Sequence, residues 1–216
     1  MGGRFHGKSK RRGCLLSKLD LTKAYKPFFT AKKDPELLDV PPANYLMISG
    51  RGAPGSEIYQ AKVSALFGVA YPLKFKAKSM GNDYAVSKLE GLWWFDTYDG
   101  PTPPREEWNW TMMIRQPDFI TPEMAEGVKQ EVFAKKGTPE IDEVSFETLH
   151  EGLSAQIMHL GPYSAEEPTI QTLHEFVYQQ GYILRGKHHE VYLKDPLKSD
   201  PEKLQTIIRH PVEKAS

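Results

Sequence analysis

Apolar residues recur along the chain at the spacings of helices and strands, and capping residues mark several helix starts. Thr121-Pro122-Glu123 combines a hydroxyl cap, a proline at the first helical position and an acid. The pattern predicts a short helix within residues 19–33 that Asp20 can cap, a helix beginning at Ser56, a helix from Thr121 that Gly137 ends, and a helix from about Ile170 to Gly181.

Strands are predicted where short apolar runs lie between turn residues. Gly91 interrupts the longest run, so this strand is expected to be bent. The predicted strands cover residues 44–50, 84–95, 108–114, 153–160, 188–193 and 204–209.

The order strand, helix, strand, strand occurs twice, in residues 40–136 and 145–212. Met113-Ile-Arg-Gln-Pro117 also matches Ile207-Ile-Arg-His-Pro211. Two such units side by side form an α+β domain with a pseudo-two-fold axis, and the groove between them is a favoured ligand site. We therefore expect a duplicated module over residues 18–213 with a central ligand groove.

Composition narrows the class of protein. The chain has 216 residues, 39% of them apolar, and no apolar run approaches the roughly 20 residues of a membrane span. Cys14 is its single cysteine, which excludes an internal disulfide framework and a cysteine-rich zinc site. No membrane partner is expected, and a reducing cytoplasm is the expected compartment.

The net charge of zero conceals an asymmetry. Residues 1–18 carry six Lys and Arg and no acid, which leaves 22 bases against 28 acids in the rest. Residues 2–9 fit the pattern of a phosphate-binding P-loop, but neither the strand nor the helix that this loop needs is predicted around them. We interpret residues 1–17 as a disordered basic arm. The acidic body argues against direct DNA binding.

Candidate chemistry gathers on the strand at residues 188–193. Strand alternation places His188, Glu190 and Tyr192 on one face, and Val191 and Leu193 on the other. The apolar face is expected to pack under the helices, which would leave imidazole, carboxylate and phenol together on the opposite face.

The repeat extends this face into the first half. Aligning Leu92-Trp93-Trp94 with Glu190-Val191-Tyr192 places Trp94 on the same face as Glu190, and Glu90 with it. Trp94 and Tyr192 would then wall a groove with Glu190 on its floor. A carboxylate among aromatic rings suits a flat cation, and such surroundings also raise the pKa of a Glu toward that of a general acid or base.

Simpler interpretations remain open for each residue. A Glu on a strand is often solvated, tryptophans such as Trp110 are more often core residues, and Tyr163 fits a turn. His188 and Glu190 with His159 form only a weak metal pattern, so no metal or cofactor is expected. The sequence shows no Ser/His/Asp pattern that would indicate covalent catalysis.

Several segments together resemble the GyrI-like small-molecule-binding proteins over about residues 18–213. They are Lys18-Leu-Asp-Leu21, Leu38-Asp-Val-Pro41, Asp83-Tyr-x-Val86, Leu89-Glu-Gly-Leu-Trp-Trp94, Trp108-x-Trp-Thr-Met-Met-Ile-x-Gln-Pro-Asp-Phe119, Gln156-Ile-Met-His-x-Gly-Pro-Tyr163 and His188-His-Glu-x-Tyr-Leu-x-Asp-Pro196. The resemblance implies the duplicated strand–helix–strand–strand (SHS2-type) module and a groove for planar, often cationic, drug-like molecules. It also implies an acidic residue at Glu190 and aromatic walls at Trp94, Tyr163 and Tyr192.

Two functions follow as expectations. In the first, the protein hydrolyses cyclopropanoid DNA-alkylating compounds, as stand-alone members similar to it are reported to do, with catalytic roles for Glu190, Tyr163 and Tyr192. In the second, it only sequesters drugs or modulates a protein partner such as gyrase. The residues expected to contact the ligand are Trp94, Trp110, Tyr163, His188, Glu190 and Tyr192.

Overall fold

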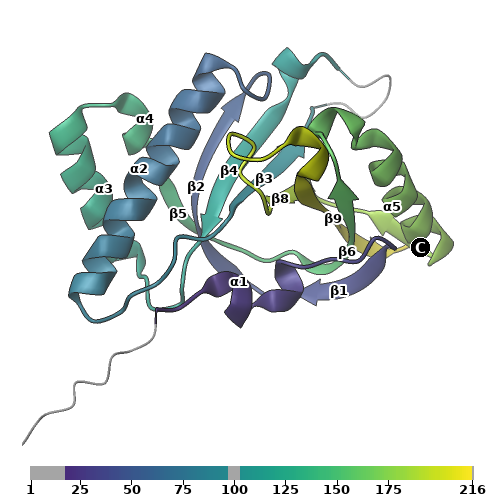
Figure 1. The fold of residues 1–216 in the computed structure, drawn as a ribbon, viewed down its shortest axis with the longest axis horizontal. Coiled ribbons are helices and arrows are strands. Elements are labelled where there is room, and N and C mark those ends of the chain that lie inside the picture. Colours follow the sequence, from purple (N-terminus) through teal and green to yellow (C-terminus); the bar gives the residue numbers. More distant parts are fainter. Residues whose placement is uncertain (1–17, 97–102, 216) are drawn as a thin grey trace, which may run out of the picture.

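A single antiparallel sheet carries the fold of the computed structural model, which describes residues 18–96 and 103–215 (Figure 1). Its strand order is β1-β6-β9-β8-β3-β4-β2-β5, and β7 pairs with β9 outside this path. The strands are β1 (Glu36–Val40), β2 (Ala43–Arg51), β3 (Leu89–Trp94), β4 (Asn109–Arg115), β5 (Ser145–Leu149), β6 (Gly152–Leu160), β7 (Tyr182–Leu184), β8 (His188–Tyr192) and β9 (Gln205–Lys214). The basic arm predicted for residues 1–17 lies outside the described residues.

Local capping explains where the helices begin. Asp20, Ser56 and Thr121 each accept a backbone N–H of the first turn, as predicted. Gly137 adopts a left-handed φ of 64° and ends the third helix. The helices are α1 (Leu21–Ala24), α2 (Glu57–Ser79), α3 (Pro122–Lys136), α4 (Pro139–Asp142) and α5 (Glu167–Gln179).

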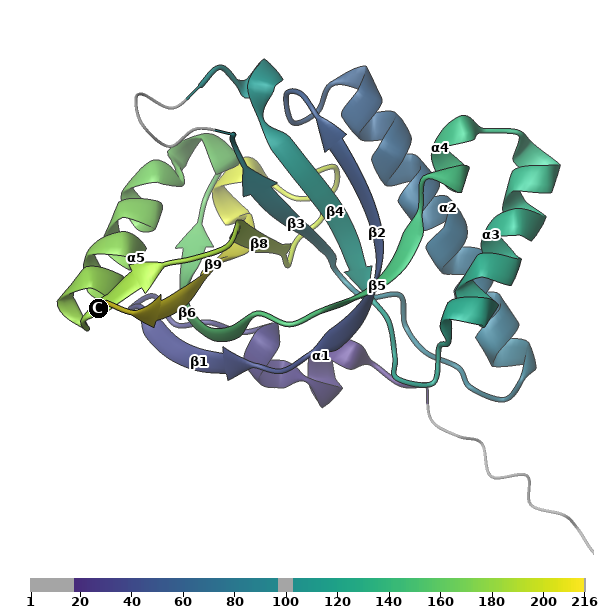
Figure 2. The ribbon, with the colours of Figure 1, turned by 180° about the vertical axis from the view of Figure 1, so that it is seen from behind.

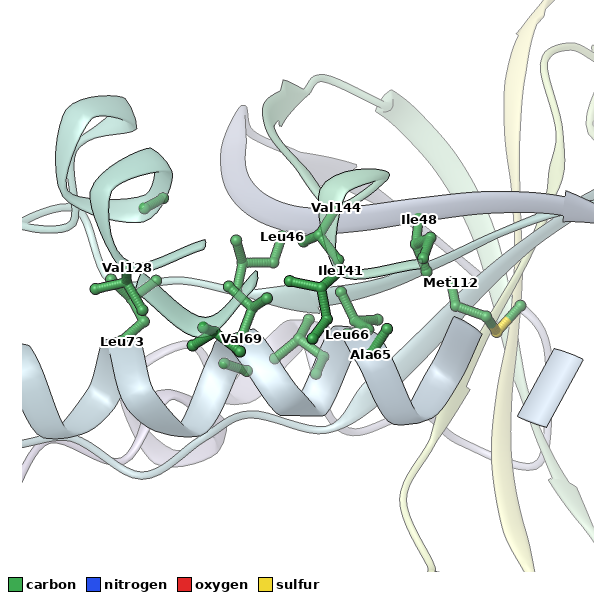
Figure 3. Packing of buried hydrophobic residues seen from close by; sticks show 14 of the residues in the cluster. Leu46, Ile48, Ala65, Leu66, Val69, Leu73, Met112, Val128, Ile141 and Val144 are labelled. Atoms are coloured by element: carbon green, nitrogen blue, oxygen red, sulfur yellow. The ribbon is translucent and has the colours of Figure 1, made fainter. Parts of the chain in front are cut away.

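The largest core lies between α2 and the strands β2 and β4. Leu66, Val69 and Leu73 of α2 are fully buried, and they belong to the same cluster as Ile48 of β2 and Met112 of β4 (Figure 3). A smaller core under α5 contains Leu173, Val177, Ala155, Ile157, Ile208 and Val212. Each half of the sheet is therefore covered by a long helix of its own.

Both helices cover the same face of the sheet. Residues opposite one another in an antiparallel pair share a face. One such row crosses six strands through Ile157, Ile208, Glu190, Gly91, Met112 and Ile48. The isoleucines at one end belong to the core under α5, and Met112 and Ile48 belong to the core under α2. Glu190 and Gly91 occupy the middle of the row, where β8 and β3 join the two halves (Figure 1).

The opposite face is covered differently from our prediction. Val191 was expected to pack under the long helices, but it clusters with Ile207 and Phe29, beside Tyr25 and Phe28. These aromatic residues come from the segment around α1 and the 3-10 helix Lys26–Phe28. The prediction is wrong because it assumed that only the long helices could cover an apolar face.

Several elements were missed or misjudged in the sequence. The predicted strand 84–95 is regular only over β3, and Tyr84 forms an isolated bridge with Leu19. The edge strands β1 and β5 and the short elements α4 and β7 were not predicted. Figure 2 shows from behind how the chain passes from β5 to β6 and how β1 lies along β6.

The strand orders of the two halves correspond. From edge to centre the first half runs β5-β2-β4-β3, and the second runs β1-β6-β9-β8. This arrangement agrees with an α+β fold around one large antiparallel sheet. The duplication of an SHS2-type module stays a prediction, and it requires the two halves to superpose. Within the described residues, no helix is long and apolar enough to cross a membrane.

Candidate functional site

Glu190 lies at the centre of the helix-covered face, directly opposite Gly91 on β3. A Cβ atom on Gly91 would lie 3.0 Å from both the Tyr192 hydroxyl and Trp93 Nε1. The absence of a side chain at Gly91 therefore lets these two groups approach each other beside Glu190. The Glu190 side chain is 13% exposed, so its carboxylate remains within reach of solvent.

Aromatic residues from four elements gather around this carboxylate. Trp93 Nε1 donates a 3.0 Å hydrogen bond to the Tyr192 hydroxyl, and the ring of Tyr59 from α2 stacks on Trp93 at 6.2 Å. The Tyr163 ring meets the Tyr192 ring edge-on at 5.7 Å. These contacts hold three phenols in fixed positions on one side of the sheet.

The negative charge of Glu190 contributes to the raised pKa values of the three tyrosines. Burial, followed by the negative charge of Glu190, raises the pKa of Tyr59 and of Tyr192 above the usual value. Burial and the charges of Glu166 and Glu190 raise the pKa of Tyr163 to about 12. All three phenols therefore keep their protons at neutral pH. The Tyr59 hydroxyl donates to Met112 Sδ, and the Tyr192 hydroxyl is hydrogen-bonded to Glu190.

His188 fixes the position of the Glu190 carboxylate. The two side chains lie on the same face, and His188 Nε2 is 3.1 Å from Glu190 Oε1. On its other side His188 faces His210, which in turn faces His174. Burial and the charges of His188 and His174 lower the pKa of His210 to about 3, so His210 is neutral at physiological pH.

A second carboxyl group belongs to this site and was not predicted. Glu166 precedes α5, is 7% exposed, and its carboxyl group faces the Thr206 hydroxyl. Burial, followed by the charge of Glu190, raises the pKa of Glu166 to about 9. The sequence signal was its position three residues after Tyr163, where the turn that carries Tyr163 leads into α5.

Trp94 and Trp110 do not have the predicted places. The register pairs Trp93 with His188, so Trp93 shares the Glu190 face and Trp94 lies on the opposite one. There the Trp94 ring lies under Lys187 Nζ at 3.3 Å. Trp110 is on the Glu190 face but fully buried behind Tyr59, and its Nε1 donates to the carbonyl of Gly52. The structure thus brings Glu190, Tyr192, Tyr163 and His188 together and separates both tryptophans from them.

The opposite face of β3 and β8 holds a different charged cluster. His189 Nδ1 lies 3.0 Å from Glu151, and its Nε2 lies 3.1 Å from Glu90. Arg209 adds a second cation 3.5 Å from Glu151. All four side chains are at most 3% exposed. The alignment of the two halves of the sequence had placed Glu90 on the Glu190 face, but Glu90 belongs to this cluster.

Charge compensation sets the pKa values in this cluster. Burial alone would raise the pKa of Glu151, but His189 and then Arg209 lower it to about 2. Burial likewise opposes the charge of His189, but Glu151 and then Glu90 raise the His189 pKa to about 9. His189 is therefore an imidazolium at neutral pH that donates to both carboxylates.

The described residues offer little support for a metal centre. No group of three or more His, Cys, Asp or Glu among them is arranged to hold a metal ion. His159, the third member of the weak metal pattern, contacts Thr169 and the carbonyl of Pro162 instead of Glu190.

Two surface hollows lie away from the Glu190 cluster. One, of about 310 Å³, lies between β6 and α5, and the other, of about 450 Å³, lies beside α1. No predicted site residue lines either of them. The central groove between the halves therefore stays a prediction.

Comparison with known proteins identifies the family. The model of the family described as "GyrI-like small molecule binding domain" matches residues 33–213. The chain belongs to this family. An uncharacterized conserved protein from Listeria innocua is 38% identical, with a TM-score of 0.85 over 91% of this chain and all of the other.

Two further similar structures carry a functional description. Both are described as hydrolases from Listeria innocua. They are 38% and 37% identical, with TM-scores of 0.80 and 0.81, and each covers 91% of this chain and all of its own. Among curated proteins there is no significant match.

Proposed function

We propose that this protein binds planar hydrophobic or cationic drug-like molecules at the Glu190 cluster. The observation that carries the proposal is a partly exposed carboxylate placed among three phenols, with only His188 as its ion-pair partner among the described residues. Membership of a small-molecule-binding family supports it. A flat cation would gain charge pairing with Glu190 and cation–π attraction from the rings.

The position of the cluster supports the same proposal. Glu190 lies where the two helix-covered cores end, in the row between Ile208 and Gly91. A ligand placed there would be bounded by α2 through Tyr59 and by the turn before α5 through Tyr163. Partial desolvation of a carboxylate costs stability, and a cationic ligand beside Glu190 would reduce that cost.

Hydrolysis is the second candidate, supported by the two similar structures described as hydrolases. The substrate would be a cyclopropane conjugated to a carbonyl group in a DNA-alkylating compound. Glu190 takes a proton from water, the water oxygen bonds to a ring carbon, and the ring C–C bond breaks. Its electron pair moves to the carbonyl oxygen, which receives a hydrogen bond from Tyr163 or Tyr192.

The test of binding compares Glu190→Gln with the wild type for a cationic and a neutral dye of similar shape. The amide keeps the shape of the carboxylate and loses its charge, so the cation should lose about 1–3 kcal/mol of affinity and the neutral dye much less. Glu175→Gln, on the exposed surface of α5, is the matched control. Equal losses for both dyes, or none, would contradict the proposal.

The test of hydrolysis follows the absorbance of a cyclopropyl-indolone compound over time. If the wild type turns it over, Glu190→Gln should slow the reaction about 10²–10⁴-fold, the usual effect of removing a general base. Stoichiometric binding without product would leave sequestration or modulation of a protein partner such as gyrase as the function.

A further inference from the structure

The hollow beside α1 is lined by positive charge. It has a volume of about 450 Å³, and three lysines line it: Lys23, Lys26 and Lys88. None of the described residues that line it is acidic. This contrasts with the rest of the chain, because beyond residue 18 there are 22 bases against 28 acids. The hollow therefore presents a local positive potential to an anion.

Two of these lysines have no counter-charge in contact. Among the described residues, no carboxylate lies within 4.0 Å of the Lys26 or the Lys88 ammonium group, and neither group donates a hydrogen bond to them. The hydrogen bond from Lys198 and, more weakly, the charge of Lys88 lower the pKa of Asp195, but the Asp195 carboxylate pairs with Lys198 at 2.9 Å. The positive charge of Lys26 and Lys88 thus remains available to a ligand.

The hydroxyl groups of the hollow are already used as donors. Thr22 Oγ1 donates to Asp20 Oδ1 at 2.7 Å, and Thr30 Oγ1 donates to the carbonyl of Lys26 at 2.9 Å. Asp20 also lies 3.7 Å from Lys23, whose side chain is 85% exposed, so this ion pair is weak. The side-chain donors left for a ligand are the ammonium groups, which suit a carboxylate, sulfonate or phosphate group.

Two apolar side chains give the hollow a fixed floor. Phe29 is 5% exposed and belongs to a buried cluster on the sheet, against which Leu193 also packs. Main-chain contacts hold both residues in place. The carbonyl of the preceding Phe28 accepts a 3.0 Å hydrogen bond from Arg209, and the N–H of Leu193 donates to the carbonyl of Gln205 at 3.0 Å. A rigid apolar floor beside free ammonium groups fits a molecule that is apolar at one end and anionic at the other.

We propose that this hollow binds a small amphipathic anion, with the apolar part on Phe29 and Leu193 and the anionic group within reach of Lys26 and Lys88. Its volume falls in the usual range of small-molecule sites. The site lies apart from the Glu190 cluster and selects the opposite charge, so it goes beyond the proposed function and does not depend on it.

Two probes that share their rings and differ in charge test the proposal. 8-Anilinonaphthalene-1-sulfonate is an anion, and N-phenyl-1-naphthylamine has the same rings without the sulfonate. Calorimetric titration of the wild type should show one sulfonate per chain. Because the lysines are exposed to solvent, the sulfonate affinity should fall about threefold to fivefold when about 0.3 M NaCl is added, and the naphthylamine affinity should not fall.

Three variants assign the binding to the hollow. Lys26→Gln and Lys88→Gln should each weaken sulfonate binding about threefold to tenfold and naphthylamine binding by less than about twofold. Neither lysine forms an ion pair with the described residues, so both variants should fold as the wild type does. Lys135→Gln, at an exposed lysine in the last turn of α3, removes the same charge elsewhere and should retain both affinities.

Selective loss of the sulfonate in Lys26→Gln and Lys88→Gln, but not in Lys135→Gln, supports the inference. Equal losses for both probes, an unchanged sulfonate affinity in both variants, or a wild type that does not bind the sulfonate overturns it. An affinity that ignores the lysine variants and rises in Glu190→Gln would place the anion at the Glu190 cluster and also overturn it. The cationic-dye result for Glu190→Gln is independent of these outcomes, so failure of this inference is distinguishable from failure of the proposed function.

Discussion

The two faces of the β3–β8 strand pair both carry buried carboxyl groups, but they balance charge in different ways. On one face Glu90 and Glu151 surround His189, and Arg209 completes the cluster, so two anions meet two cations. On the other face Glu190 and Glu166 lie among phenols, and His188 is the ion-pair partner of Glu190 among the described residues. Similar residue types thus form one cluster that matches two carboxylates with two cations, and one in which two carboxyl groups have a single ion-pair partner, His188, among the described residues.

This difference separates a structural role from a binding role. A buried charge is tolerated when a counter-charge and hydrogen bonds satisfy it, and the His189 cluster meets that condition across the junction of the two halves. In the Glu190 cluster the buried carboxyl group of Glu166 has the negative charge of Glu190 as its neighbour. Such an arrangement costs stability, and sites that bind ligands commonly carry this cost.

The largest expected effect comes from breaking the closed cluster. Glu151→Gln leaves His189 and Arg209 with too little negative charge at a fully buried place. We expect a loss of about 3–5 kcal/mol in the free energy of unfolding, measured by urea denaturation at pH 7. Glu175→Gln on the surface serves as the control. A loss below about 1 kcal/mol would show that the cluster does not hold the two halves together.

On the other face, replacing a buried carboxyl group by an amide should raise the free energy of unfolding instead of lowering it. The pKa of Glu166 is raised from 4.5 to about 9 in the folded protein. The stability it contributes is therefore fully present below pH 4.5 and is lost as the pH rises toward 9. Glu166→Gln does not titrate, so it should be more stable than the wild type at pH 8, by about 1–3 kcal/mol, and close to it at pH 4.5. Urea denaturation at both pH values checks this.

That result would be contradicted by a Glu166→Gln variant that is less stable than the wild type at pH 8. Glu166 would then be a structural residue like Glu151, and the two faces would not differ in the way described.

The smallest expected effect sharpens the placement of the aromatic residues. Tyr163→Leu removes a ring from the Glu190 face, so the affinity for a cationic dye should fall by about 1 kcal/mol. Trp94→Leu removes a larger ring from the opposite face and should leave that affinity unchanged. Fluorescence titration of both variants decides the point, and a loss in Trp94→Leu alone would favour a ligand on the Lys187 side of the sheet.

Much of the fold was predictable because its signals are local. Asp20, Ser56 and Thr121 cap helices where the sequence placed them, and most predicted strands coincide with β2, β4, β6, β8 and β9. The edge strands β1 and β5 could not be predicted from the sequence, because their burial is incomplete and their pairing partners lie far away in the sequence. For the site, strand alternation alone put His188, Glu190 and Tyr192 on one face.

The sequence by itself determined the starts of α1, α2 and α3, the grouping of His188, Glu190 and Tyr192 on one face of β8 and, through its motifs, the family. Only the tertiary structure decided which residues of β3 join that face. Side chains alternate with a period of two, so aligning Trp94 with Tyr192 in the repeat placed Glu90 and Trp94 on the Glu190 face. The observed pairing of Gly91 with Glu190 places Gly91 and Trp93 there instead. The tertiary structure also decided the different charges of Glu166 and Glu151, because a carboxyl pKa depends on burial and on counter-charges contributed by distant strands.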